Sequence, residues 1–284
     1  MKQSVRRWLF SAGAVAAVGV SVGGQLGTAS AAKTTSAAKT ASAAEVVTVD
    51  HKATTAGAAA PAYVPPRQNF NFGAHGAAVR SVQRRLNQLH YYAGRADGHY
   101  GQNTAEAVWA FKEAQGLPMN ASTNTLVTWA FRRALVHPRA PKVLVPKGGG
   151  SRIEINQNDE LLVLYRHNKV RLILHVSSGG GYTYPCPGDP SATCGPAITP
   201  DGNYTALSFA PGWVKVPLGT MYNPVFFIGR AYAIHGDIPV PWYPASHGCI
   251  RIWMDAANFF HKDISIGGAH PTPIYVRGTA PYYL

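Results

Sequence analysis

The sequence predicts two folded domains: a small all-α domain of three short helices, residues 69–136, and a mainly β domain with one clear helix, residues 151–277. In the first region apolar residues recur at helical spacings. In the second they form short runs that turn-forming residues separate. Residues 32–68 offer almost nothing to bury, so both domains lie after position 68.

The first 31 residues have the three parts of a secretory signal peptide. Lys2, Arg6 and Arg7 form a positive start, an apolar run follows, and a small-residue triplet ends at Ala31. Glycines interrupt the apolar run, and it falls short of the roughly 20 apolar residues of a spanning helix. We therefore expect cleavage and secretion into a cell wall or periplasm-like space, without a stable membrane span. The alternative is a retained membrane anchor.

Residues 32–68 are rich in Ala, Thr, Ser, Lys and Pro, which predicts a disordered linker because such residues cannot offset the entropy of ordering. The chain carries 26 Lys+Arg against 13 Asp+Glu, a net charge of +13. Residues 141–284 contribute only 11 basic against 8 acidic side chains, so the excess lies earlier. In an exported protein nucleic acid is not an expected partner. An anionic wall polymer or membrane surface fits this charge, as does solubility alone.

The three cysteines divide into a pair and a single residue once export is accepted. Cys186 and Cys194 lie in a Pro/Gly-rich segment that can fold back on itself, and an oxidising location favours a disulfide between them. Cys249 is left unpaired and is a candidate reactive thiol. The alternative is a buried structural cysteine, although its Gly and His neighbours do not resemble core residues.

The first helix of the small domain is predicted from Val79, Val82, Leu86 and Leu89, whose spacings of three, four and three give one apolar face. A turn cluster, "DGHYG", follows this helix and ends at Gly101.

The second helix is predicted to begin at Asn103, a cap residue that Glu106 follows three positions later. Gly116 is expected to end it. A third helix is expected from about Ser122 to Arg133.

This arrangement resembles the peptidoglycan-binding domain, a targeting module of bacterial wall enzymes. Its marks are a helix, the turn motif "DGHYGQNT", a second helix and the following "GL". The resemblance implies that residues 69–136 attach the protein to the wall without catalysis, and that residues 137–150 form a linker. Turn and cap chemistry explains the matched turn residues equally well.

Residues 152–179 predict a three-stranded antiparallel meander, because the turn formers "NQND" and "RHNK" separate three apolar runs. Further strand candidates are "GNYTALSF", "PVFFIG", "RAYAIHG", "GCIRIW" and "TPIYV". One helix is predicted to start at Asp255, and residues 278–284 form a C-terminal tail.

His235 follows one strand candidate and Cys249 begins another, so the two side chains meet if these strands are neighbours. A free cysteine has a pKa of about 8.5, which leaves only a few per cent thiolate at neutral pH. An imidazole with a pKa near 6.5 can take the thiol proton and later return it. The pattern therefore predicts a cysteine nucleophile with a histidine base.

Neighbouring residues complete this candidate site. Gly236 and Gly248 allow close approach of substrate and backbone. The backbone N–H groups of His247, Gly248 and Cys249 are candidates for an oxyanion hole. Arg251 lies two residues after the cysteine, on the same strand face, and is placed to hold a substrate carboxylate.

The pair His235-Gly236, followed by the run Ser-His-Gly-Cys-Ile-Arg at 246–251, resembles the signature of the L,D-transpeptidase catalytic domain. The resemblance covers about residues 151–277, including "SSGGG", "TPDGNYTA" and "DAANFF". It implies that Cys249 is the nucleophile and His235 its base. The pocket and oxyanion hole are assigned to Ser246, Gly236, His247 and Gly248, and substrate binding to Arg251, Trp242 and Tyr243. The loop between the two motifs, residues 236–245, is shorter than is common in the family.

Together the resemblances imply an exported peptidoglycan L,D-transpeptidase, a cysteine acyltransferase without cofactor or metal, which joins stem peptides by 3→3 cross-links. With water as acceptor the same site would be an L,D-carboxypeptidase. Three other classes stay open: a zinc site of His235, His247 and Cys249, a papain-like protease, whose cysteine normally precedes its histidine, and a non-catalytic wall-binding protein.

Overall fold

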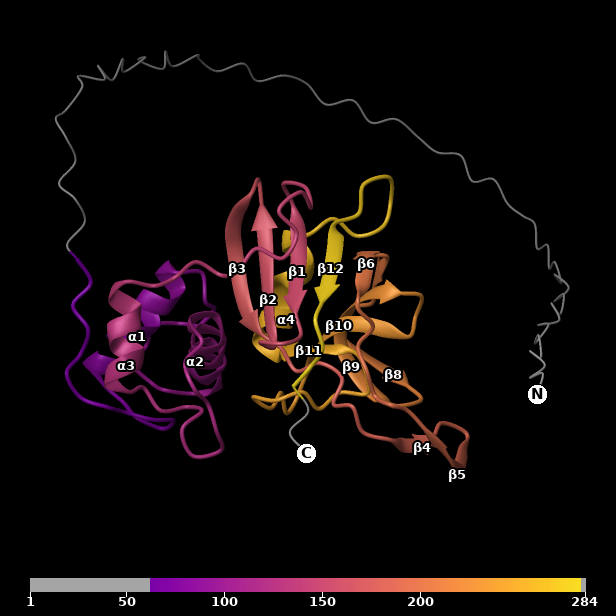
Figure 1. Ribbon diagram of the computed structural model, residues 1–284, viewed down its shortest axis with the longest axis horizontal. Helices are drawn as coiled ribbons and strands as arrows, with labels where there is room; N and C mark the ends of the chain where they lie inside the picture. Colours follow the sequence, from indigo (N-terminus) through magenta and orange to yellow (C-terminus); the bar gives the residue numbers. More distant parts are fainter. Residues whose placement is uncertain (1–61, 282–284) are drawn as a thin grey trace, which may run out of the picture. The chain divides into compact units, whose positions relative to one another are not determined.

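The structure is a computed structural model that describes residues 62–281 (Figure 1). The predicted signal peptide and most of the predicted linker lie outside the described residues. No helix within the described part of the chain is long and apolar enough to cross a membrane.

The helical region, residues 69–136, contains α1 (Ala77–Gln88), α2 (Gln102–Gln115) and α3 (Trp129–Val136). Val79, Val82 and Leu86 are buried on one face of α1, as their spacing predicts. Helix α2 ends at Gly116, whose φ of 65° lies in the left-handed region, and this prediction is also confirmed.

The start of α2 differs from the prediction. The helix begins at Gln102 with Gly101 as its N-cap residue, and no side chain caps it. The side-chain amide of Asn103 instead donates a hydrogen bond to Asp255 of the β-rich region, at 2.6 Å. The prediction that Asn103 caps α2 is wrong, because Asp255, far along the chain, binds the Asn103 side chain instead.

Helix α3 begins at Trp129, later than the predicted Ser122. The Thr128 hydroxyl accepts a hydrogen bond from the Phe131 backbone N–H and caps the helix there. The preceding residues form turns, so the predicted length was too great.

The β-rich region is built from two main sheets and a hairpin. The first sheet has the order β3-β2-β1-β12-β6, with β1 Arg152–Asn156, β2 Leu161–Arg166, β3 Lys169–His175, β6 Gly202–Thr205 and β12 Pro273–Arg277. The second has the order β11-β10-β9-β7, and β8 also pairs with β9. Its bounds are β7 Ser208–Phe209, β8 Trp213–Val216, β9 Gly219–Ile228, β10 Tyr232–Asp237 and β11 Ile250–Trp253. The hairpin joins β4 (Tyr184–Cys186) to β5 (Asp189–Cys194).

The predicted meander is confirmed, because β1 pairs antiparallel with β2 and β2 pairs antiparallel with β3. Side chains of both sheets share one apolar cluster, including Ile153 from β1 and Ile234 from β10. Helix α4 (Met254–Phe260) adds Phe260 to this cluster and starts one residue before its predicted position. A short 3₁₀ turn, η1 (His261–Asp263), follows it.

The helical region packs against the face of the first sheet that points away from this core. Leu161, Val163 and Ile173, on β2 and β3, belong to the same apolar cluster as Phe111 of α2. Strands β2 and β3 are therefore covered on both faces, which explains their continuous apolar runs.

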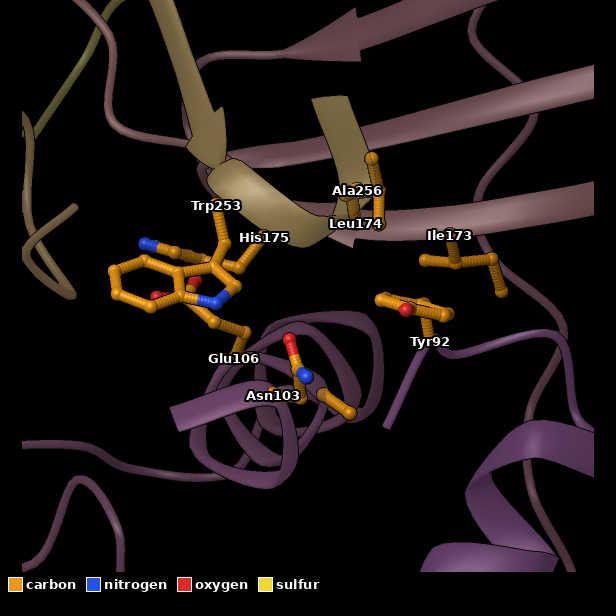
Figure 2. A pocket seen from close by; sticks show the side chains of 9 residues that line it. Tyr92, Asn103, Glu106, Ile173, Leu174, His175, Trp253 and Ala256 are labelled. Atoms are coloured by element: carbon orange, nitrogen blue, oxygen red, sulfur yellow. The ribbon is translucent and has the colours of Figure 1, made fainter. Parts of the chain in front are cut away.

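Buried carboxyl groups beside this contact, among them Glu106 and Glu160, predict a pH-dependent stability. Glu106, on α2, lies beside His175 in a small cavity (Figure 2). Burial raises the pKa of Glu106 to about 7 and that of Glu160 to about 8, from an ordinary value of 4.5. The folded state then holds protons that the unfolded chain releases. The contribution of these groups to the free energy of unfolding is therefore complete below about pH 4.5 and is lost as the pH rises through 7 to 8.

We therefore expect the melting temperature, measured by calorimetry, to fall between about pH 5 and pH 8. Glu106→Gln should flatten the fall, because glutamine stays neutral throughout. A melting temperature that rises over this window in the wild type would contradict the assignment.

Candidate active site

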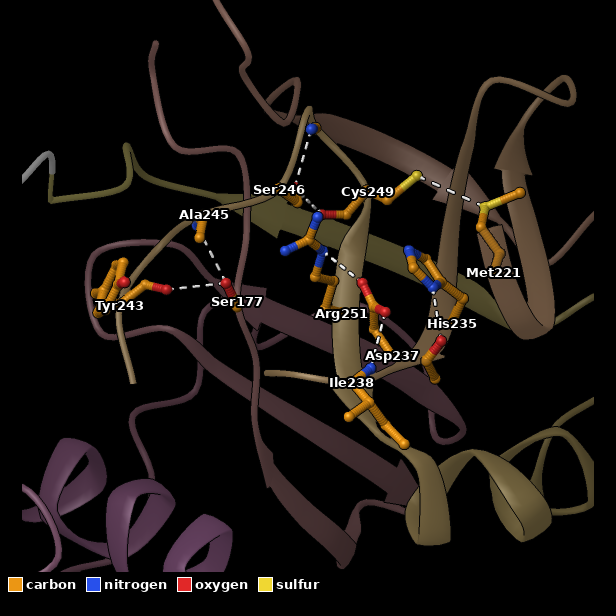
Figure 3. Close-up of polar contacts among 12 residues, drawn as sticks. Ser177, Met221, His235, Asp237, Ile238, Tyr243, Ala245, Ser246, Cys249 and Arg251 are labelled. Atoms are coloured by element: carbon orange, nitrogen blue, oxygen red, sulfur yellow. Dashed lines mark hydrogen bonds and ion pairs between the residues drawn. The ribbon is translucent and has the colours of Figure 1, made fainter. Parts of the chain in front are cut away.

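The two strands that carry the candidate site are neighbours, as the sequence predicts. Strand β10 pairs parallel with β11, which places His235 opposite Arg251 and Ile234 opposite Ile250. Cys249 directly precedes β11, so its side chain lies beside the strand that holds the histidine (Figure 3).

A cavity of about 650 Å³ opens at this end of the sheet. His235, Ser246, His247, Cys249 and Arg251 all line it, so most of the predicted site residues come together.

The Cys249 thiol is the free sulfhydryl of the described chain. Its Sγ lies 4.0 Å from the Met221 sulfur and 3.7 Å from the Ala231 carbonyl oxygen. Burial raises the pKa of Cys249, so the thiol is protonated at neutral pH. Among the hydrogen bonds of the described residues, none joins this sulfur to His235. Figure 3 shows the sulfur turned toward Met221, so a side-chain rotation separates this conformer from a hydrogen-bonded pair.

The His235 imidazole is buried and held in one orientation. Its Nδ1 lies 2.9 Å from the carbonyl oxygen of Gly236. A carbonyl can only accept, so Nδ1 carries the hydrogen and Nε2 keeps a free lone pair. Burial lowers the pKa of His235, which keeps the ring neutral near pH 7. The ring is thus prepared to accept a proton at Nε2.

The turn before Cys249 is tied by a serine hydroxyl. Ser246 Oγ accepts from the Gly248 N–H at 2.9 Å and donates to the Cys249 carbonyl at 2.6 Å. The Gly248 N–H is therefore already hydrogen-bonded. Of the three predicted oxyanion donors, the backbone N–H groups of His247 and Cys249 remain as candidates. Gly248 has a φ of +134°, and a Cβ there would lie 2.6 Å from the Ile198 carbonyl oxygen, so the position requires glycine.

Arg251 is positioned by a residue that the sequence analysis missed. Its Nε lies 2.9 Å from Asp237 Oδ2, and both residues line the cavity. The only sequence signal was the position of Asp237 directly after the His-Gly pair. The ion pair fixes the guanidinium on the cavity wall.

The side chain of His247 packs against the hairpin and the residues just before it. Its ring packs edge-on against Tyr184 at 4.6 Å and Tyr182 at 5.4 Å between centroids. Burial, and then the charge of Arg251, lower the pKa of His247. Within residues 62–281, His235, His247 and Cys249 do not converge into a metal-binding group.

The predicted disulfide joins Cys186 to Cys194 and closes the β4–β5 hairpin. Tyr184, on β4, lines the cavity and packs on His247. The hairpin therefore forms one wall of the site.

Neither Trp242 nor Tyr243 is among the described residues that line this cavity, and their role in substrate binding stays a prediction. Trp242 packs against the apolar cluster of the helical region. The Tyr243 carbonyl accepts a hydrogen bond from Ser177. Tyr184 and Tyr232 provide the aromatic lining instead, and no motif in the sequence marked them.

Comparison with known proteins identifies the family. Residues 75–125 match the family model of a peptidoglycan-binding domain, and residues 150–276 match that of the L,D-transpeptidase catalytic domain. A crystal structure of an L,D-transpeptidase from Xylanimonas cellulosilytica shares 33% sequence identity, covers 75% of this chain and 100% of that chain, and has a TM-score of 0.65. This chain belongs to the L,D-transpeptidase family.

Other L,D-transpeptidase structures are more distant. One from Stackebrandtia nassauensis has 15% identity over 75% of this chain and 97% of that chain, with a TM-score of 0.42. One from Mycobacterium smegmatis has 20% identity over 45% and 59% of the two chains, with a TM-score of 0.35. No curated protein matches the chain. The two matched domains associate this L,D-transpeptidase with peptidoglycan and the cell wall.

The Cys186–Cys194 bridge carries a testable prediction for stability. Replacing both cysteines with serine should lower the free energy of unfolding by about 2–3 kcal/mol in the chain-entropy model. Activity should also fall, since the hairpin that places Tyr184 in the cavity loosens. Denaturant unfolding and non-reducing peptide mapping test this, and mapping that joined Cys249 to either partner would contradict both the pairing and the site.

Proposed function

We propose that the protein is an exported peptidoglycan L,D-transpeptidase that uses Cys249 as nucleophile and His235 as general base. The observation that carries this proposal is the single cavity shared by the unpaired thiol and a buried imidazole whose Nε2 is free to accept a proton. The Cys186–Cys194 disulfide supports export, because such bonds persist in oxidising compartments.

In the first half-reaction the substrate is a tetrapeptide stem. The Cys249 thiol rotates toward His235 and gives its proton to Nε2, and the sulfur attacks the carbonyl carbon before the terminal D-residue. The N–H groups of His247 and Cys249 stabilise the oxyanion. The C–N bond then breaks, and His235 returns the proton to the departing amine. The product is a thioester between Cys249 and the tripeptide.

In the second half-reaction an amine of a neighbouring stem attacks the thioester carbonyl. His235 takes a proton from this amine and returns it to the sulfur as the C–S bond breaks. A 3→3 cross-link forms, and the thiol is regenerated.

The electrostatics of the pair define how the thiolate arises. Burial raises the pKa of Cys249 and lowers that of His235, so both groups are neutral before substrate binds. Proton transfer therefore accompanies attack, instead of preceding it as in a stable thiolate–imidazolium pair. Two arginines, Arg230 and Arg251, and one carboxylate, Asp237, line the cavity, and this net positive charge suits a substrate with free carboxylates.

A second outcome uses the same residues. Cys249 is partly exposed, so water can reach the thioester and release a tripeptide. The protein would then act as an L,D-carboxypeptidase. The shape of the loops around the acceptor decides the balance between transpeptidase and carboxypeptidase reactions.

The experiment is mass spectrometry of muropeptides after incubation with a tetrapeptide stem. The proposal expects cross-linked dimers joined through the third residues, together with the released D-amino acid. Tripeptide alone would assign the carboxypeptidase reaction. Unchanged tetrapeptide would overturn both, and would leave a non-catalytic wall-binding protein.

A further inference from the structure

A buried histidine outside the cavity links the helical region to the active-site loop. His175, the last residue of β3, has 2% exposure. Its Nδ1 lies 2.7 Å from Glu113 Oε1 on α2, and its Nε2 lies 2.9 Å from the Pro241 carbonyl oxygen. Figure 2 shows His175 beside α2, whose Glu106 lines the adjoining cavity. Pro241 belongs to the loop 238–245, which runs between the two motifs of the active site.

The direction of the hydrogen bond between His175 and Pro241 is fixed. The Pro241 carbonyl can only accept, so Nε2 of His175 must carry the hydrogen. The short contact on the other side then requires one proton between Nδ1 and Glu113 Oε1. Burial, and then Asp159, raise the pKa of Glu113 well above its usual value. The 2.7 Å contact between Nδ1 and Oε1 holds that proton between the two side chains, so Glu113 fixes the imidazole ring. The chain runs from Glu113 through His175 to Pro241.

The rest of the loop is fastened to the segment that follows His175. Ser177 Oγ donates to the Tyr243 carbonyl at 2.8 Å. The Ser178 carbonyl accepts from the backbone N–H of Ala245 at 3.0 Å and of Ser246 at 2.9 Å. Any shift of this segment therefore reaches the turn that carries Cys249.

Helix α2 also supports the loop by packing. Trp109 lies edge-on against the His175 ring, with centroids 5.2 Å apart. Trp242, in the loop, packs against the apolar cluster that contains Trp109 and Phe111. Helix α2 thus contacts the histidine and contributes to the apolar cluster on which the loop packs.

We propose that α2 of the peptidoglycan-binding domain positions the active-site loop, with Glu113 as a positioning residue that acts through His175 on the Pro241 carbonyl. The domain is then part of the catalytic unit as well as an attachment module. The proposal rests on the proposed function only in the choice of reaction to be measured.

The test compares variants of the full chain. Glu113→Met keeps a side chain of similar length but cannot hydrogen-bond to His175, whereas Glu113→Gln can do so through its amide. Lys112→Met is the matched control, because Lys112 is the adjacent buried residue of α2 and its Nζ bonds to the Thr123 and Asn124 carbonyls within the helical region. Both Met variants should lose thermal stability, so stability alone does not distinguish a positioning role.

Two readouts decide the proposal. Glu113→Met should lower kcat on a soluble tetrapeptide by about tenfold or more, because misplaced reacting groups slow the chemical step. KM should change less, and Glu113→Gln and Lys112→Met should stay within about twofold of the wild type on the same reasoning. The alkylation rate of Cys249 by iodoacetamide, followed by mass spectrometry, should change only in Glu113→Met.

Unchanged kcat and alkylation in Glu113→Met, or equal losses in Lys112→Met, would overturn the proposal. A wild type that forms no product would defeat the proposed function, and the alkylation rates would still decide whether Glu113 positions the loop.

Discussion

Replacing Cys249 with alanine should abolish turnover of a soluble tetrapeptide stem, lowering the rate by at least about a thousandfold as the loss of a covalent nucleophile does. The sulfur makes few contacts, chiefly with Met221 and the Ala231 carbonyl, so the fold should survive. Product formation by chromatography and the melting temperature check the two statements together.

A matched control for this variant is the double serine replacement of Cys186 and Cys194, which removes two sulfurs but keeps Cys249 free. It should lose stability and part of its activity while still turning over. If Cys249→Ala retained turnover comparable to that of this control, Cys249 would not be the nucleophile.

Replacing His235 with alanine should lower kcat/KM by about a hundredfold to ten-thousandfold, the usual range for removal of a general base. The reason lies in the thiol: burial raises the pKa of Cys249, so too little thiolate forms at neutral pH when no imidazole takes the proton. The pH dependence of the variant's activity gives a second test. The variant's activity should keep rising above pH 9, as the thiol ionises without help.

In the wild type, by contrast, the acid limb should lie below pH 6.5, since burial lowers the pKa of His235 and the ring stays a base there. His247→Ala is the matched control: its ring packs on Tyr182 and Tyr184, so its loss should alter KM more than kcat. A His235→Ala profile that parallels the wild type would contradict the role of the base.

The chemistry-bearing residues could be predicted because their pattern is local. The His-Gly pair and the Ser-His-Gly-Cys run each end or begin a short apolar strand, and strand pairing brings them together. The orientation of individual groups could not be predicted. Examples are the hydrogen bond from the Gly248 N–H to Ser246 and the ion pair of Asp237 with Arg251. Side-chain directions depend on dihedral angles, which composition does not reveal.

The fold shows the same division. Periodicity predicted the meander and the apolar face of α1, since each requires only neighbouring residues. Strand β8 and the first half of β9 escaped prediction, because Pro217 and Gly219 at their connection give a turn signal inside a weakly apolar run. Trp242, which the sequence assigns to the substrate, is partly buried against the apolar cluster of the helical region, a long-range contact that no local pattern shows.

Two separate domains were predicted from the sequence, because the residue patterns and compositions of the two regions differ. The structure places Leu161, Val163 and Ile173 in the apolar cluster of the helical region and pairs His175 with Glu113. A buried polar pair separated by 62 residues leaves no periodic signal. Contacts of this kind are visible only after folding.

The most direct measurement is mass spectrometry of the enzyme itself, quenched during turnover of a tetrapeptide stem and digested. The peptide containing Cys249 should gain the mass of a tripeptide acyl group, and added acceptor amine should remove it. The adduct should be absent from Cys249→Ala. An acyl group on any other residue, or product formation with no adduct on Cys249 under conditions that trap the intermediate, would contradict the role of Cys249 as nucleophile.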